Sequence, residues 1–247
     1  MSWRVCRQRT VKKAHFLMSD TTNMTDTQKL QIWQQNLNRS LEGQLDLLHS
    51  LKAEKYDVVM IQEPHIDFLG HTRANLHWLV LYPTNHLDNP KKTRSVILIN
   101  CNILTNNWEG LNIISNNVMG VHLHGQFGAI YLFNIYNECG NNESLKVVEN
   151  FMEGRGDRQG RGSEERLKML WVGDFNRHHP IWDEERNVHL FTTAALEVAQ
   201  PLLDLISKYD MKMVLPKDIP TLEACTTKNF TRVDSVFCSA ELYDLFI

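Results

Sequence analysis

The segment at residues 171–182, WVGDFNRHHPIW, places side chains capable of acid–base chemistry at the end of a hydrophobic run. Asp174 and Asn176 follow Gly173 with one residue between them, and Arg177 comes next. A carboxylate can orient or deprotonate a water molecule, and an amide can donate to a developing oxyanion. Because ligands and reacting groups gather at strand ends in α/β folds, this segment predicts a site that needs partners from other strands.

Polar residues also lie at the ends of four other hydrophobic runs: Asn36, Glu63, Tyr136 and Asp234. Taken one at a time, an Asn or Asp at a strand end usually caps a turn, and a Tyr in a strand usually packs. The recurrence of such residues along one chain favours a different interpretation, in which they project together from one rim of layered sheets.

Five segments carrying these residues resemble motifs of the endonuclease/exonuclease/phosphatase superfamily, relatives of exonuclease III. They are QNLNRS, IQEP, NIYN, GDFNRHHP and TRVDSVFCS, in this order along the chain. The wider segments QEPHID and GDFNRHHPIWDEERN are similar to endonuclease domains of LINE-type (non-LTR) retrotransposons, those of fungi in particular. The resemblance runs from about Leu30 to the end of the chain, and QEP followed by GDFN is its most specific part.

The resemblance implies a phosphodiester hydrolase with Mg²⁺ as its metal, or Mn²⁺ in its place. Glu63 would be the metal carboxylate, with Asn36 beside it. Asp174 would orient or deprotonate the attacking water, while Asn176 and Tyr136 would hold phosphate oxygens as neutral donors. Mg²⁺ takes only one or two carboxylates and keeps several waters, so this small donor set is sufficient.

Asp234 is the acid of the last motif and is a further catalytic candidate that could also assist Glu63 at the metal. Arg39 and Arg177, which follow the first amide and the GDFN block, are candidate phosphate contacts together with His178. The partner implied is DNA, with no small-molecule cofactor and no membrane.

The pattern of strands and helices predicts an α/β or α+β fold with layered sheets. Strands are expected at 30–36, 58–63, 95–100, 117–125, 129–137, 167–174, 211–216 and 231–240. Helices are expected at 40–57 with Ser40 as its cap, at 143–151, and at 192–210 with an interruption at Pro201. The resemblance narrows this to a four-layered α/β sandwich, two mixed sheets packed face to face and flanked by helices, lacking the last strand.

The sequence predicts a disordered tail at residues 1–28, one domain at 29–247, and a mobile Gly/Arg/Glu loop at 152–166. The 247 residues carry a net charge of −3, so DNA would have to be met by a local basic patch. Five scattered cysteines and no secretory signal favour an intracellular protein, nuclear or cytoplasmic. A monomer, or part of a longer polyprotein, is expected.

The superfamily's final motif, SDH-x-P, does not occur among these residues. Its histidine contacts the reacting phosphate, and loss of one such group costs about 10²–10⁴-fold in rate. His178 and His179 are the candidate substitutes, although both are better interpreted as shaping a loop. The histidines at 65, 71, 77 and 86 match no standard zinc spacing.

Four functions therefore stay open. The first is a retrotransposon-type DNA endonuclease, weakened or inactive without the final motif. The second is a non-catalytic nucleic-acid-binding remnant. The third is a phosphatase or phosphodiesterase of the same superfamily acting on a small or lipid phosphate, and the fourth is a folded domain with no retained activity.

Overall fold

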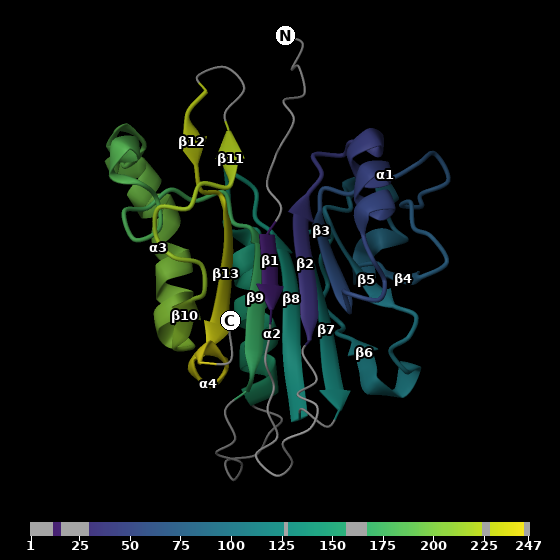
Figure 1. Ribbon diagram of the computed structural model, residues 1–247. Coiled ribbons are helices and arrows are strands. Elements are labelled where there is room, and N and C mark those ends of the chain that lie inside the picture. Colours follow the sequence, from purple (N-terminus) through teal and green to yellow (C-terminus); the bar gives the residue numbers. More distant parts are fainter. Residues whose placement is uncertain (1–11, 16–29, 126–127, 157–166, 224–227, 245–247) are drawn as a thin grey trace.

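The computed structural model describes residues 12–15, 30–125, 128–156, 167–223 and 228–244. Two mixed sheets pack face to face with helices on their outer faces (Figure 1), which confirms the predicted four-layered sandwich. One apolar layer lies between the sheets, a second lies between the first sheet and its helix, and a third lies between the second sheet and its helices.

The first sheet has the strand order β1-β2-β3-β5-β4. Its strands are β1 (Lys12–His15), β2 (Gln31–Asn36), β3 (Val58–Gln62), β4 (Trp78–Leu81) and β5 (Ser95–Asn100). Only β2 and β3 pair in parallel, and α1 (Leu41–Ser50) covers the outer face. As expected, Ser40 caps α1 by accepting a hydrogen bond from the backbone N–H of Gly43 at 3.0 Å.

Strand β3 shows how the two faces of this sheet are filled. Val58 and Met60 face the second sheet, whereas Val59 and Ile61 face α1, so all four side chains are buried. The sequence of a strand that is covered on both faces is hydrophobic throughout and does not alternate between apolar and polar residues. This explains why VVMI is apolar throughout and why the polar residues gather at its end.

The second sheet has the order β10-β13-β9-β8-β7-β6. Its strands are β6 (Trp108–Gly110), β7 (Val118–Gly125), β8 (Gly128–Tyr136), β9 (Met169–Asp174), β10 (Met211–Met213) and β13 (Asp234–Ser239). Helices α2 (Glu143–Gly156) and α3 (Thr193–Lys208) cover its outer face, and α4 (Ala240–Tyr243) follows β13. The small hairpin of β11 (Leu222–Glu223) and β12 (Phe230–Thr231) projects above one rim (Figure 1).

Four short 3-10 helices connect these elements: η1 (Thr84–His86), η2 (Pro90–Lys92), η3 (Thr105–Asn107) and η4 (Glu185–Leu190). Helix α3 continues through Pro201 without the interruption expected there. Within the described ranges, no helix has the length and apolar character that a membrane crossing requires.

Several expected boundaries differ in the structure. Helix α1 ends at Ser50, although a helix was expected up to residue 57, and β10 ends at Met213, although a strand was expected up to residue 216. Within the segment predicted as a tail, residues 12–15 form β1, which pairs antiparallel with the outer edge of β2. The loop expected at 152–166 starts later, because α2 continues to Gly156 and buries Met152 against the second sheet. The remainder of both segments, residues 1–11, 16–28 and 157–166, lies outside the described residues.

Gly173, one residue before the end of β9, permits the parallel pairing of β8 and β9. A Cβ atom added there would lie 1.8 Å from the carbonyl oxygen of Ile135 on β8. No side chain fits such a space, and the atom in the way belongs to the backbone.

We expect Gly173→Ala to destabilise the fold by about 4 kcal/mol or more, because the two central strands must separate. The matched control is Gly154→Ala in α2, where an added Cβ meets nothing within 4 Å. That change should stabilise the protein by up to about 1 kcal/mol. Chemical denaturation of both variants checks the prediction, and equal stabilities would contradict it.

Candidate active site

The sheet registers bring the predicted strand-end residues to one rim. Tyr136 at the end of β8 lies beside Asp174 at the end of β9, and the antiparallel β13 places Asp234 opposite Asp174. On the facing sheet, Asn36 ends β2 and Glu63 directly follows β3. The two sheets thus contribute acidic groups to the same end of the sandwich.

Asn36 joins the two sheets at this rim. Its Nδ2 donates a hydrogen bond of 2.7 Å to Oδ2 of Asp174, and it also hydrogen-bonds Glu63. Its Oδ1 accepts from the backbone N–H of Asn38 at 2.8 Å. Asn36 therefore holds the carboxylate of Asp174 in place, and its role as a metal ligand stays a prediction, because its amide oxygen keeps a second lone pair.

Asp174 is buried between other acids. Burial raises its pKa well above the ordinary value, the charge of Asp234 raises it further, and hydrogen bonds from Asn36 and the backbone N–H of Asn176 oppose the rise. Burial also raises the pKa of Glu63. The charge of Arg39 and hydrogen bonds from Tyr136 and Asn36 oppose this rise only in part. The site therefore concentrates negative charge in a place where water stabilises it poorly.

Arg94 partly balances that charge. Its Nη1 donates to Oε1 of Glu63 at 3.1 Å, and its guanidinium lies 5.6 Å from the centre of the Tyr136 ring. The backbone reinforces the pair, because the N–H of Glu63 donates to the carbonyl of Arg94 at 2.7 Å. Arg94 is a site residue that was not predicted from the sequence.

Tyr136 and Asn176 are positioned as neutral donors. Burial raises the pKa of the Tyr136 hydroxyl, and the charges of Glu63 and Asp174 raise it further, so the hydroxyl keeps its proton at neutral pH. Nδ2 of Asn176 donates to the carbonyl of Asn137 at 2.9 Å, which fixes the amide beside Asp174.

Backbone strain accompanies the site. Asn38, Arg39, Glu63 and Asn176 all have positive φ angles, between 47° and 58°. Non-glycine residues rarely adopt this left-handed conformation, which costs on the order of 1–2 kcal/mol each. Strain of this kind clusters at functional sites because the surrounding contacts hold it in place.

A chain of buried amides lies beneath the carboxylates. Nε2 of Gln34 donates to Oε1 of Gln62 at 2.7 Å and to Oδ1 of Asp234 at 3.2 Å. Gln62 donates in turn to Asn134, whose Nδ2 donates to the carbonyl oxygens of Ile61 and Val96. These amides cross between the sheets and fix Asp234. These amides were not predicted from the sequence, although amides inside otherwise apolar strands indicate a buried hydrogen-bonded network.

Arg177 is buried among backbone carbonyl groups and is not exposed to solvent. Its side chain is only 2% exposed, and it donates to the carbonyl oxygens of Asn141, Asn176 and Val198 and to Oδ1 of Asn142. The arginine therefore braces the loop that follows β8, so we do not propose it as a phosphate contact.

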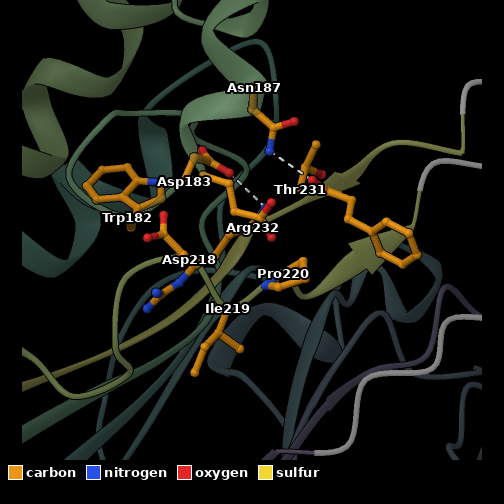
Figure 2. Close-up of a pocket in the computed structure, with 10 residues that line it drawn as sticks. Trp182, Asp183, Asn187, Asp218, Ile219, Pro220, Thr231 and Arg232 are labelled. Atoms are coloured by element: carbon orange, nitrogen blue, oxygen red, sulfur yellow. Dashed lines mark hydrogen bonds between the residues drawn. The ribbon is translucent and has the colours of Figure 1, made fainter.

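His178 lies near the rim, with Nδ1 3.2 Å from Oδ2 of Asp183. Figure 2 shows Asp183 beside Arg232 and Asn187 around a small hollow with no space for a water-sized molecule. Asp183 accepts from the backbone N–H of Arg232 at 2.9 Å. Burial lowers the pKa of Arg232 to about 10, so it remains charged at neutral pH. Because small-molecule pockets need a far larger space, this hollow is packing between loops.

The donor set fits a hydrated divalent cation. Among the described residues, no three His, Cys, Asp or Glu side chains are grouped so that they could enclose a metal ion. Mg²⁺ does not need such a cage, because it takes one or two carboxylates and retains water. Glu63 is one such carboxylate, at a site whose buried negative charge favours a cation.

No known protein-family profile matches the chain, and no curated protein matches it. Solved structures do match. The endonuclease domain of TRAS1, a telomere-specific non-LTR retrotransposon, has a TM-score of 0.62 at 18% identity, covering 87% of each chain. The AP endonuclease LMAP from Leishmania major has a TM-score of 0.61 at 12% identity, covering 86% of this chain and 80% of that one.

An AP endonuclease from Archaeoglobus fulgidus also matches, with a TM-score of 0.55 at 17% identity, covering 87% of this chain and 88% of that one. At these identities the likeness concerns the fold. All three chains are named as endonucleases, and the present chain shares their architecture over most of its length.

The raised pKa of Asp174 predicts how stability depends on pH. A carboxyl group whose pKa is raised by folding is protonated in both the folded and the unfolded state at pH values below its unfolded pKa near 4. In that range it does not lower the free energy of unfolding. As pH rises from there through the folded pKa, the metal-free wild type loses stability relative to Asp174→Asn. The loss is about 1.4 kcal/mol for each pH unit separating the two pKa values.

Thermal unfolding from pH 4 to 9 in EDTA measures this difference. Asp46→Asn, an exposed change on α1, is the control and should follow the wild-type curve. Parallel curves for wild type and Asp174→Asn would contradict the prediction.

The ion pair at Glu63 predicts competition between Arg94 and a divalent cation. Removing the guanidinium by Arg94→Met should tighten Mg²⁺ or Mn²⁺ binding roughly three- to tenfold, as expected for a pair worth about 0.5–1.5 kcal/mol. Titration calorimetry measures the change, with the exposed Lys212→Met on β10 as control. Weaker metal binding in Arg94→Met would show that Arg94 supports the metal site instead of competing with it.

Proposed function

Because the chain has the fold of the endonuclease/exonuclease/phosphatase superfamily, we propose that it is a Mg²⁺-dependent phosphodiesterase that nicks DNA. The observation that carries the proposal is the hydrogen bond from Asn36 on the first sheet to Asp174 on the second, with Glu63 close enough to Asn36 for its pKa to be lowered by it. This contact gathers a proton acceptor, a metal carboxylate and the Tyr136 donor at one rim.

In this proposal Asp174 orients the attacking water and takes its proton. Its raised pKa favours this role, because a general base works best when its pKa approaches the working pH. The Tyr136 hydroxyl donates a hydrogen bond to a phosphate oxygen and keeps its proton, and the Asn176 amide donates a hydrogen bond to another oxygen. Bound at Glu63 and Asp234, Mg²⁺ would neutralise charge that develops on the phosphate.

We assign basic side chains at the rim to the DNA phosphates that flank the reacting one. Arg39 lies in the strained turn after β2, and its charge acts on Glu63, which places it beside the site. Arg94 is the second cation, and His178 is the third group that we assign to flanking phosphates. Such contacts position the duplex without reading its sequence.

For these 247 residues we expect slow turnover. None of them completes an SDH-x-P motif, and Nδ1 of His178 lies against Asp183. A site without a histidine at the reacting phosphate should be about 10²–10⁴-fold slower than one that has it.

A non-catalytic nucleic-acid-binding protein is the second candidate. The Arg94–Glu63 ion pair favours it, because a carboxylate held by a guanidinium is less available to a cation. Under this alternative the rim binds phosphates with its cations and does not hydrolyse them.

Nicking of supercoiled plasmid tests the proposal. We expect slow conversion to the open circle with Mg²⁺, none with EDTA, and at least a 10²-fold loss in Asp174→Ala. Asp46→Ala, exposed on α1, should nick like the wild type. Plasmid binding without metal-dependent nicking by the folded protein would contradict the enzyme and favour the binding protein.

A further inference from the structure

The loop at residues 64–77 holds two adjacent large apolar side chains in solvent at its tip. It connects β3 to β4 and begins directly after Glu63. Phe68 is 86% exposed and Leu69 is 65% exposed, side by side at the tip of the loop. Single exposed apolar residues are ordinary, but an adjacent Phe–Leu pair on an ordered tip next to an acidic site requires a reason.

The tip is rigidly built. Oδ1 of Asp67 accepts from the backbone N–H groups of Leu69 and His71, each at 2.9 Å. The backbone N–H of Asp67 donates to the carbonyl of His71 at 2.8 Å, and a bridge pairs Ile66 with Thr72. These bonds hold Phe68 and Leu69 outward, so little conformational entropy is lost when they are buried by a partner.

The tip is also fastened to η2. Nζ of Lys91 donates to the carbonyl of Ile66 at 3.0 Å and to that of Asp67 at 2.5 Å. Gly70, with φ of +87°, sits so close to Pro90 that an added Cβ would lie 3.0 Å from its ring. Residue 94, which holds Glu63, follows η2 by two positions. One short segment therefore supports both the tip and the candidate metal carboxylate.

The charge around the tip suits a polyanion. Lys91 and Lys92 are exposed on η2, and Arg73 is exposed on the returning arm of the loop. The carboxylate of Asp67 is bound by backbone N–H groups and by Arg73 at 3.8 Å, so it adds little free negative charge. Apolar side chains ringed by cations match a duplex, whose stacked bases lie between two rows of phosphates.

Chain geometry limits how far the tip lies from the reaction. Phe68 lies five positions after Glu63, and a fully extended chain spans at most about 3.3–3.6 Å per residue. The two Cα atoms are therefore within about 18 Å of each other. At about 3.4 Å per base along a strand, this corresponds to about five base steps.

We propose that Phe68 and Leu69 form a wedge that enters a groove of duplex DNA and opens one base step within about five steps of the nicked phosphate. The proposal rests on the proposed function and adds a substrate preference to it. Opening a step costs a few kcal/mol, which burial of the two side chains offsets. The cost is smallest at flexible pyrimidine–purine steps, so TA and CA/TG steps near the nick should be favoured.

Fluorescence of 2-aminopurine placed at successive positions of a duplex tests the wedge. The protein carries Asp174→Ala so that the DNA stays intact. We expect fluorescence to rise at one step near a TA sequence and to be lost in the Phe68→Ala/Leu69→Ala double variant, with binding weakened about tenfold. The matched control is Leu76→Ala, which removes an 83% exposed leucine from the same loop and should leave the signal unchanged.

The possible outcomes separate this inference from the proposed function. If the parent protein binds no duplex, the proposed function fails and the wedge fails with it. If the parent and the double variant bind equally and give the same fluorescence, the wedge alone is overturned. A dimer seen by sedimentation and abolished by the double variant, with unchanged fluorescence, would assign the tip to contact between copies and would also overturn it.

Discussion

The hydrogen bonds that Asn36 makes with Asp174 and Glu63 are the contacts on which the rest of the site depends. They bring acids from two different sheets together in a place where burial penalises charge and where the acids repel each other. A neutral amide is suited to this position because it donates to a carboxylate and adds no charge. The apolar layer between the sheets holds the two strands at the required distance, and the amides of Gln34 and Gln62 fix Asp234 below.

The site is built at a cost to stability that other parts of the fold offset. Several residues around it, including Glu63, hold left-handed backbone conformations, and the carboxyl of Asp174 has lost most of its water. Each of these features costs on the order of 1 kcal/mol or more. Three apolar layers, with β3 covered on both faces, supply the burial that makes such costs tolerable. Strain is therefore concentrated at strand ends, where the backbone leaves regular pairing.

The sequence predicted the strands and the rim well, because both follow from local patterns. Hydrophobic runs that end in Asn36, Glu63 or Asp174 place those residues at strand ends whatever the order of the strands. The roles of other side chains depend on distant segments, which a local pattern does not contain. Gln34 meets Asp234 across 200 positions, and Arg177 is buried by carbonyl groups up to 39 positions away. From its position beside GDFN, Arg177 was therefore predicted to be an exposed phosphate contact. In the fold, the loop after β8 packs against this arginine and buries it.

The segment from Pro90 to Arg94 connects the loop tip at Phe68 to the carboxylate of Glu63. Lys91 holds the loop tip, and Arg94 holds Glu63, while Thr93 between them is buried and bonded to His86 at 2.8 Å. A short segment with both ends anchored and its middle packed cannot move one end freely without disturbing the other. Under the proposed function, a duplex that contacts the tip therefore acts on the same short segment that holds Glu63.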